Sequence, residues 1–228
     1  SLSVPELAAP VAQELVRFDE LVVTLRRECP WDREQTHASL LPYLVEETYE
    51  AIEAIESGDR AHMAEELGDV LLQVVFHARV AQEDPLAPFD IDDVAAGIAA
   101  KLRRRHPHVF GDVIADTPEQ VAANWSIIKA AEKAEKAAKA AAAGAQVAEA
   151  ATLGPLHGIP AGMPPLAKAA QLVTRLDLAG RGDLVDAAAA GADPGARLLA
   201  VVAEVARRRD DPDAVLRAAL RSLADAAG

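Results

Sequence analysis

Residues 46–50 read Glu-Glu-Thr-Tyr-Glu, and residues 66–69, beyond a Gly58-Asp59 break, read Glu-Leu-Gly-Asp. Apolar residues around both stretches recur at the helical period, which predicts two helices joined by a short turn. Helices joined in this way run antiparallel and lie against each other. We therefore expect the two acidic stretches to face each other as one cage of carboxylates.

A helical wheel divides each of these helices into an apolar side and an acidic side. The apolar stripe expected on the first helix consists of Leu44, Thr48, Ala51, Ile52 and Ile55. Glu47 borders this stripe, Glu50 lies next to it, and Glu46 lies further round. The second helix is apolar around most of its circumference, so we expect it to be buried on several sides. Its remaining polar wedge consists of Glu66, Asp69, Gln73 and His77.

Carboxylates on an otherwise apolar helix are costly unless a cation accompanies them. Arg60 and Arg79 stand at the ends of the second helix, so neighbouring side chains do not supply that cation. Proteins bind Mg²⁺ through a few carboxylates together with phosphate oxygens of a substrate. The sequence therefore predicts a metal-dependent enzyme that acts on a phosphate compound.

Two other interpretations of the acidic residues compete with this one. A solvated face accounts for the glutamates of an ordinary helix, but two clusters that face each other favour a metal site over it. A ferritin-like di-iron centre needs Glu-x-x-His on two helices, and neither cluster has a histidine three residues on. Asp59 and His62 have that spacing but lie across the turn, so we discount them.

The composition narrows the class of function further. The 228 residues carry a formal charge of −13, which argues against binding to nucleic acid or to an acidic membrane. No apolar run reaches the ~18 residues of a membrane span, and residues 1–5 have no signal-peptide pattern. The lone Cys29 fits a reducing compartment, so we expect a cytoplasmic protein.

Capping residues and periodicity predict an all-α protein. Residues 30–37 are expected to form a loop, because the residue before Pro30 resists the helical conformation. Pro42 is expected in the first turn of its helix, where it is tolerated. Helices are expected over residues 10–27, 39–57 and 59–82, from Asp90 to the residue before Pro107, and from Thr117 onward.

The chain divides into three expected parts: a catalytic domain over residues 10–135, a linker over 136–164, and a second helical module over 165–228. The linker is rich in Ala, Lys and Glu and then in Pro and Gly. Residues 195–202 resemble residues 68–75, but without the acidic residues. The second module therefore has the pattern of a degenerate copy of the first.

Few other side chains are candidates for binding a substrate. Residues 101–106 form the densest basic run, which either meets phosphates or neutralises the end of a helix. Trp31 either stacks on a nucleotide base or covers the hydrophobic core. Lys129 either binds phosphate or is the first residue of a solvent-exposed segment rich in Lys and Glu. Trp125 is expected in the core. No glycine-rich loop of the P-loop or dinucleotide-binding type is present.

These motifs together resemble the MazG family of nucleoside triphosphate pyrophosphohydrolases. The family pattern is Glu-Glu-x-x-Glu followed after a spacer by Glu-x-x-Asp, and it is matched by residues 46–50 and 66–69. The flanking matches are Cys-Pro-Trp-Asp at 29–32, Gln-Thr at 35–36, Glu-Glu-Leu-Gly-Asp at 65–69 and Arg-Arg-His-Pro-His-Val-Phe at 104–110. The resemblance covers residues 15–135 well and residues 155–228 only faintly.

The resemblance implies an all-α helical bundle that forms a dimer or larger homo-oligomer, with Mg²⁺ or Mn²⁺ in each site. It implies hydrolysis of an NTP or dNTP to the monophosphate and pyrophosphate, which cleans the nucleotide pool. Carried over by position, Glu47, Glu50, Glu66 and Asp69 ligate the metal, and Glu46 orients or deprotonates the attacking water. Our candidates for substrate binding are Lys101, Arg104 and Lys129 for phosphate, and Trp31 and His37 for the base.

Three alternatives remain open at this point. The first is a narrow dUTP or dCTP diphosphatase, and the second is an enzyme similar to phosphoribosyl-ATP pyrophosphatase. The third is a non-catalytic helical dimerisation module whose acidic residues are vestigial, although the intact acidic pattern favours catalysis.

Overall fold

A computed structural model describes residues 4–142 and 158–227, and within those ranges every regular element is a helix. The expected all-α class is therefore confirmed. The chain forms two compact units, Ser1–Lys129 and Ala130–Gly228, and the boundary falls inside one long helix. Among the described residues, no helix has the length and apolar character needed to cross a membrane.

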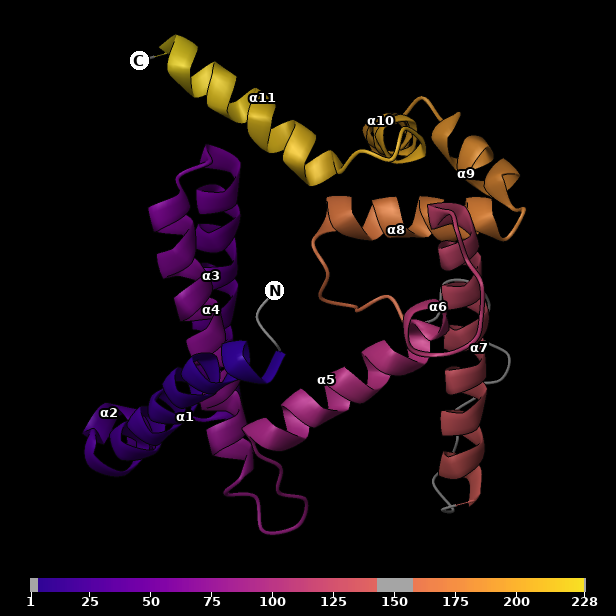
Figure 1. Cartoon of the computed structure of the whole chain (residues 1–228). Coiled ribbons are helices and arrows are strands. Elements are labelled where there is room, and N and C mark those ends of the chain that lie inside the picture. The colour runs from indigo at the N-terminus through magenta and orange to yellow at the C-terminus, as the bar shows by residue number, and fades with distance from the viewer. Residues whose placement is uncertain (1–3, 143–157, 228) are drawn as a thin grey trace. The chain divides into compact units, whose positions relative to one another are not determined.

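The first unit is built around an antiparallel pair of helices, α3 and α4, which lie side by side in Figure 1. Helix α1 packs on α4, and α5 leaves from the far end of α4. The helices of this unit are α1 (Val4–Glu28), α2 (Pro30–Glu34), α3 (His37–Ser57), α4 (Arg60–Ala81), α5 (Ile91–Arg105), α6 (Pro107–Phe110) and the start of α7 (Pro118–Ala142).

The turn between α3 and α4 has the chemistry that the sequence predicts. Gly58 ends α3 with φ +76°, a left-handed conformation that strains residues with a side chain. The Asp59 carboxylate then accepts hydrogen bonds from the backbone N–H groups of Ala61 (2.9 Å) and His62 (3.2 Å). These bonds satisfy donors that the first turn of α4 would otherwise leave without partners. The hairpin is therefore specified by local interactions at its tip.

Two short helices and one boundary differ from the expectation. The expected loop over residues 30–37 contains α2, and residues 107–110 form α6; Pro30 and Pro107 each occupy the first helical position, where the missing N–H costs nothing. Helix α3 begins at His37, because Thr36 and Ser39 form a capping box. Pro42 therefore lies inside α3, beyond its first turn, and the expectation for it was wrong.

The buried side of α3 is rotated relative to the predicted stripe. Its buried residues are Leu40, Ala51 and Ala54, whereas Thr48 is exposed and Ile55 is 53% exposed. The two alanines allow the backbone of α3 to approach α4 closely, and this contact decides which side is covered. The core of the unit consists of Val22, Leu40, Val75 and Phe76, with Phe18, Leu72, Val80 and Ile91 packed around it.

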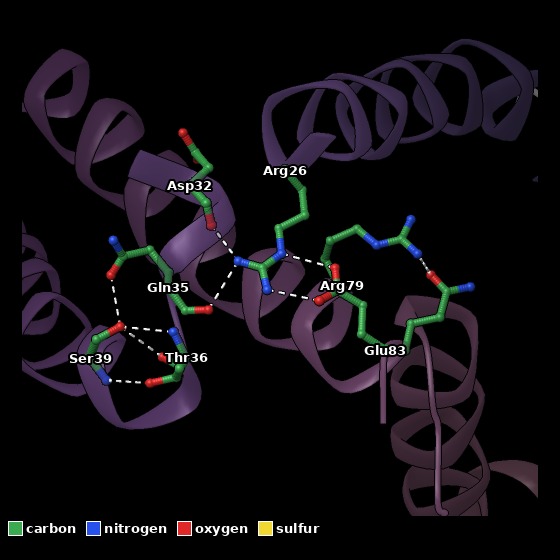
Figure 2. Close-up of polar contacts among 8 residues, drawn as sticks. Arg26, Asp32, Gln35, Thr36, Ser39, Arg79 and Glu83 are labelled. Carbon is green, nitrogen blue, oxygen red and sulfur yellow. Dashed lines mark hydrogen bonds and ion pairs between the residues drawn. The ribbon is translucent and has the colours of Figure 1, made fainter. Parts of the chain in front are cut away.

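Arg26 ties the end of α1 to three other segments (Figure 2). Its guanidinium donates two hydrogen bonds to the Glu83 carboxylate, at 2.9 and 2.8 Å, and others to the backbone carbonyls of Asp32 and Gln35. The hydrogen bond and charge of Glu83 raise the pKa of Arg26, and those of Arg26 lower the pKa of Glu83. Gln35 is itself buried and accepts a hydrogen bond from Ser39 at 2.7 Å. This network holds the start of α3 in place.

The second unit is a separate helical assembly. Its helices after α7 are α8 (Pro165–Leu178), α9 (Gly182–Ala189), α10 (Pro194–Arg207) and α11 (Pro212–Ala227). Val173, Val185 and Ala203 form its core, and Arg207 joins Asp177 and Asp186 by ion pairs of 3.0 and 2.7 Å. Asp193, at the position that corresponds to Glu66, caps α10 by accepting the N–H of Ala196 at 3.0 Å. Its carboxylate therefore acts as a helix cap.

Candidate metal centre

Three carboxylates from the two antiparallel helices converge on one point. Glu47 comes from α3, and Glu66 and Asp69 come from α4; each offers an oxygen atom, and these atoms lie within 4.8 Å of one another. Glu66 and Asp69 share a face of α4 because they are three residues apart. Glu47 lies between Leu40 and Ala51 along the side of α3 that packs on α4. The carboxylate cluster of Glu47, Glu66 and Asp69 is thus a product of the helix pairing.

The cluster is partly withdrawn from water. Glu47 and Asp69 are half-buried, and the Glu66 side chain is 12% exposed. Burial raises the pKa of Glu47, and the charges of Asp69, Glu50 and Glu66 and a hydrogen bond with Glu50 raise it further. Like charges held together in this way favour either a bound proton or a bound cation.

The other two acidic residues of the predicted set lie at the edge. Glu50 is exposed but interacts with Glu47 through a side-chain hydrogen bond, so it adjoins the cluster. Glu46 precedes Glu47 on α3 and is exposed. It does not belong to the carboxylate cluster of Glu47, Glu66 and Asp69. Its carboxylate faces solvent, where a water molecule can reach it.

A histidine that the sequence interpretation discounted touches the cluster. His62 Nε2 lies 3.0 Å from Glu66 Oε1, one turn before it on α4. The i, i+4 spacing of His62 and Glu66 is the sequence signal that corresponds to this contact. Among the residues that the structure describes, His62 is the addition to the carboxylate site that the sequence did not predict.

Two further histidines form a pair along the same helices. His37 Nδ1 and His77 Nδ1 lie 2.8 Å apart, with parallel rings whose centres are 5.2 Å apart. The distance between the two ring centres exceeds the distance between the two Nδ1 atoms by about the width of one ring. The rings therefore lie end to end, and one hydrogen bond joins them. Burial, and then the neighbouring His37, lower the pKa of His77. Gln73, in the same polar wedge, is buried.

The basic and aromatic candidates lie on other helices. Lys101 and Arg104 are on α5, and Lys129 Nζ lies 5.0 Å from the centre of the Trp125 ring on α7. Arg105 Cζ stands 5.9 Å from that ring centre, and the ring of His106 meets it edge-on. Trp125 is half-buried under these groups rather than in the hydrophobic core. The grouping of Arg105, His106, Trp125 and Lys129 is a cationic and aromatic surface that joins α5 to α7.

Trp31 makes an aromatic contact with a residue of α3. It is on α2, 48% exposed, and packs edge-on against Tyr43 of α3 with ring centres 5.6 Å apart. The structure thus brings together Glu47, Glu50, Glu66 and Asp69, whereas Trp31 lies at the junction of α2 and α3.

The fold and the site define an all-α protein with a carboxylate cluster between paired helices. Residues 35–110, which include every residue of that cluster, match the model of the MazG nucleotide pyrophosphohydrolase domain. A 26.1 kDa protein from Streptomyces cacaoi is 45% identical over 207 residues, which are 91% of this chain and 78% of that protein. The chain belongs to the MazG family of nucleotide pyrophosphohydrolases.

Other relatives carry the name of the activity. The nucleoside triphosphate pyrophosphohydrolase/pyrophosphatase MazG of Thermotoga maritima is 51% identical over 123 residues, which are 52% of this chain and 46% of that protein. This chain therefore spans about half the length of that relative. The crystal structure of a MazG-related protein from the same organism aligns with 50% of this chain and 96% of its own, with 29% identity and a TM-score of 0.44. The resemblance inferred from the sequence motifs is confirmed by the family model and by these relatives.

Proposed function

We propose that this chain hydrolyses nucleoside and deoxynucleoside triphosphates to the monophosphate and pyrophosphate, with Mg²⁺ bound at the carboxylate cluster. The observation that carries the proposal is the convergence of Glu47, Glu66 and Asp69 within the part of the chain that matches the family model. A triphosphate and an acidic cluster repel each other, so they meet productively only when a divalent cation lies between them.

The residues of the cluster fit such an ion. They offer only carboxylate oxygens, the donors that Mg²⁺ and Mn²⁺ prefer, and they are held close despite their mutual repulsion. Glu47, Glu66 and Asp69 would hold the ion, with Glu50 as a fourth ligand beside Glu47. When bound, the metal supplies neutralisation of the triphosphate charge and a lower pKa for a water molecule.

The exposed Glu46 has a different role in the proposal. Because its carboxylate lies outside the trio and faces solvent, it is free to hold the attacking water and accept its proton. A general base must lie within hydrogen-bond reach of that water, and the proposal places the water at the edge of the cluster, on the side of Glu46. Glu46 therefore orients and deprotonates the nucleophile.

The nucleotide is held by side chains outside the cluster. We assign its phosphates to Lys101, Arg104 and Lys129, and its base to Trp31 and His37. Lys129 Nζ already lies over the Trp125 ring, and a side chain with such a contact loses less conformational entropy when it binds a phosphate. A nucleotide substrate also places the activity in the cytoplasm.

We further propose that the working form is a homodimer. Leu67, Leu71 and Val74 form an apolar line on α4 that is substantially exposed in the single chain; Leu67 is 49% exposed. The sequence predicts that this helix is covered on several sides, and a second copy of α4 would supply the missing cover.

The division into a catalytic domain (10–135), a linker (136–164) and a degenerate second module (165–228) belongs to the same proposal.

The test is pyrophosphate release from a mixture of dNTPs with Mg²⁺, compared with the same reaction in EDTA. Glu66→Gln should abolish release while leaving helicity unchanged. Glu65→Gln is the matched control, because Glu65 is the exposed neighbour on the same helix and loses the same charge. If wild-type protein releases no pyrophosphate, or if the two variants behave alike, the proposal is wrong.

A further inference from the structure

We infer that His62 is a positioning residue, which holds the metal ligand Glu66 in the orientation that binds a cation. The inference rests on the proposed function. Its basis is the 3.0 Å contact from His62 Nε2 to Glu66 Oε1, between a side chain that is 43% exposed and one that is 12% exposed.

The contact is poorly suited to stabilising the helix as an ion pair. His62 is the third residue of α4, and a positive charge in the first turn is opposed by the helix dipole. In addition, an acid–base pair at i, i+4 is more favourable when the acidic residue comes first, and here it comes second. Helix stability therefore does not account for the placement of this imidazole.

Capping does not require the imidazole either. The backbone N–H of His62 is already bound by Asp59, as is that of Ala61. The side chain of His62 takes no part in these bonds, so its removal leaves the start of α4 intact. Its described polar partner is Glu66.

The chemical effect of the contact falls on Glu66. The imidazole contacts one carboxylate oxygen of Glu66, Oε1, which leaves the other oxygen available to a cation. A glutamate side chain has three rotatable bonds, and a ligand that is already oriented loses less conformational entropy when it binds. Partners that orient metal ligands typically change metal affinity by about 10- to 100-fold.

The experiment is a titration of Mn²⁺ into nucleotide-free, full-length protein, in which free Mn²⁺ is counted by its EPR signal. His62→Ala should raise the Mn²⁺ dissociation constant about 10-fold. His62→Gln should restore affinity, because a glutamine amide nitrogen reaches about as far as Nε2. His62→Asn should fail to restore it, because the asparagine nitrogen reaches only about as far as Nδ1.

A double variant isolates the interaction with Glu66. In a Glu66→Gln background, His62→Ala should have no further effect on Mn²⁺ binding, since the charged ligand that it orients is gone. Circular dichroism and the urea midpoint of His62→Ala should match wild type, because the cap at Asp59 is unaffected. The loss of affinity is then separate from folding.

Two kinds of failure can be told apart. If wild-type protein binds Mn²⁺ and His62→Ala binds it equally well or more tightly, the positioning role is wrong and the proposed function stands. If His62→Gln is as weak as His62→Ala, the polar contact with Glu66 is not the cause and the inference is also wrong. If wild-type protein neither binds Mn²⁺ nor hydrolyses dNTPs, the proposed function fails, and the inference fails with it.

Discussion

The metal-free protein should become more stable when Glu47 loses its charge, although the enzyme should become inactive. Burial and the charges of Asp69, Glu50 and Glu66 all oppose the ionised form of Glu47. Glu47→Gln keeps the size of the side chain and removes the charge. We therefore expect a gain in the free energy of unfolding in EDTA together with loss of pyrophosphate release.

The expected magnitude follows from the spacing of the carboxylates. Oxygen atoms of the cluster lie within 4.8 Å of one another, where two like charges in a water-like medium repel by roughly 1 kcal/mol. Partial screening reduces each pair to about 0.2–1 kcal/mol, so the two neighbours within this distance, Glu66 and Asp69, together cost roughly 0.4–2 kcal/mol. For a unit of about 130 residues this gain corresponds to a rise in Tm of roughly 1–7 °C.

Tryptophan fluorescence during urea unfolding reports this change selectively. Trp31 and Trp125 are the only tryptophans, and both belong to the first unit, Ser1–Lys129. In saturating Mn²⁺ the order should reverse, because wild-type protein gains about 2.7 kcal/mol when the metal is at 100 times its Kd. Glu53→Gln, a change at an exposed position of the same helix, is the control. A Glu47→Gln protein that is less stable than wild type in EDTA would refute the reasoning.

Three other predictions concern pH and individual contacts. The folded-state pKa of Glu47 is raised above its unfolded value of 4.5. Metal-free wild-type protein should therefore lose stability as the pH rises from about 4.5 through the folded pKa. The urea midpoint of Glu47→Gln should not show this dependence on pH. The folded-state pKa of His77 is lowered from 6.5, so stability should fall as the pH drops below 6.5, and His77→Gln should reduce that loss between pH 7.5 and 5.5. Arg26→Ala should cost roughly 2–3 kcal/mol in urea unfolding, because it leaves a carboxylate and backbone carbonyls without their charged donor, whereas Arg27→Ala should change stability by less than about 0.5 kcal/mol.

Local signals in the sequence were sufficient for most helix boundaries. The side chains of Asp59 and Asp90 each accept a backbone N–H at the start of a helix, and such bonds depend on only a few consecutive residues. The short helices α2 and α6 were missed because a proline at the first helical position also reads as a break. The acidic pattern also predicted that carboxylates of the two helices face each other, since two helices joined by a tight turn have few ways to pair; Glu47, Glu66 and Asp69 converge, whereas Glu46 lies outside.

Contacts between residues distant in the sequence could not be predicted in the same way. Arg26 and Glu83 are 57 positions apart, and His37 and His77 are 40 apart. Their pairing depends on how α1, α3 and α4 pack together. No period or cap in the chain encodes that arrangement.

The sequence alone determines that the protein is helical, that it turns at Gly58-Asp59, and that acidic residues from two helices face each other. These features follow from backbone conformation, capping and the helical period, which act over a few residues. Only the tertiary structure decided the rotation of α3, where Ala51 and Ala54 rather than Thr48 and Ile55 are covered. A wheel cannot fix that rotation, because it depends on the close approach that small side chains allow between two packed helices.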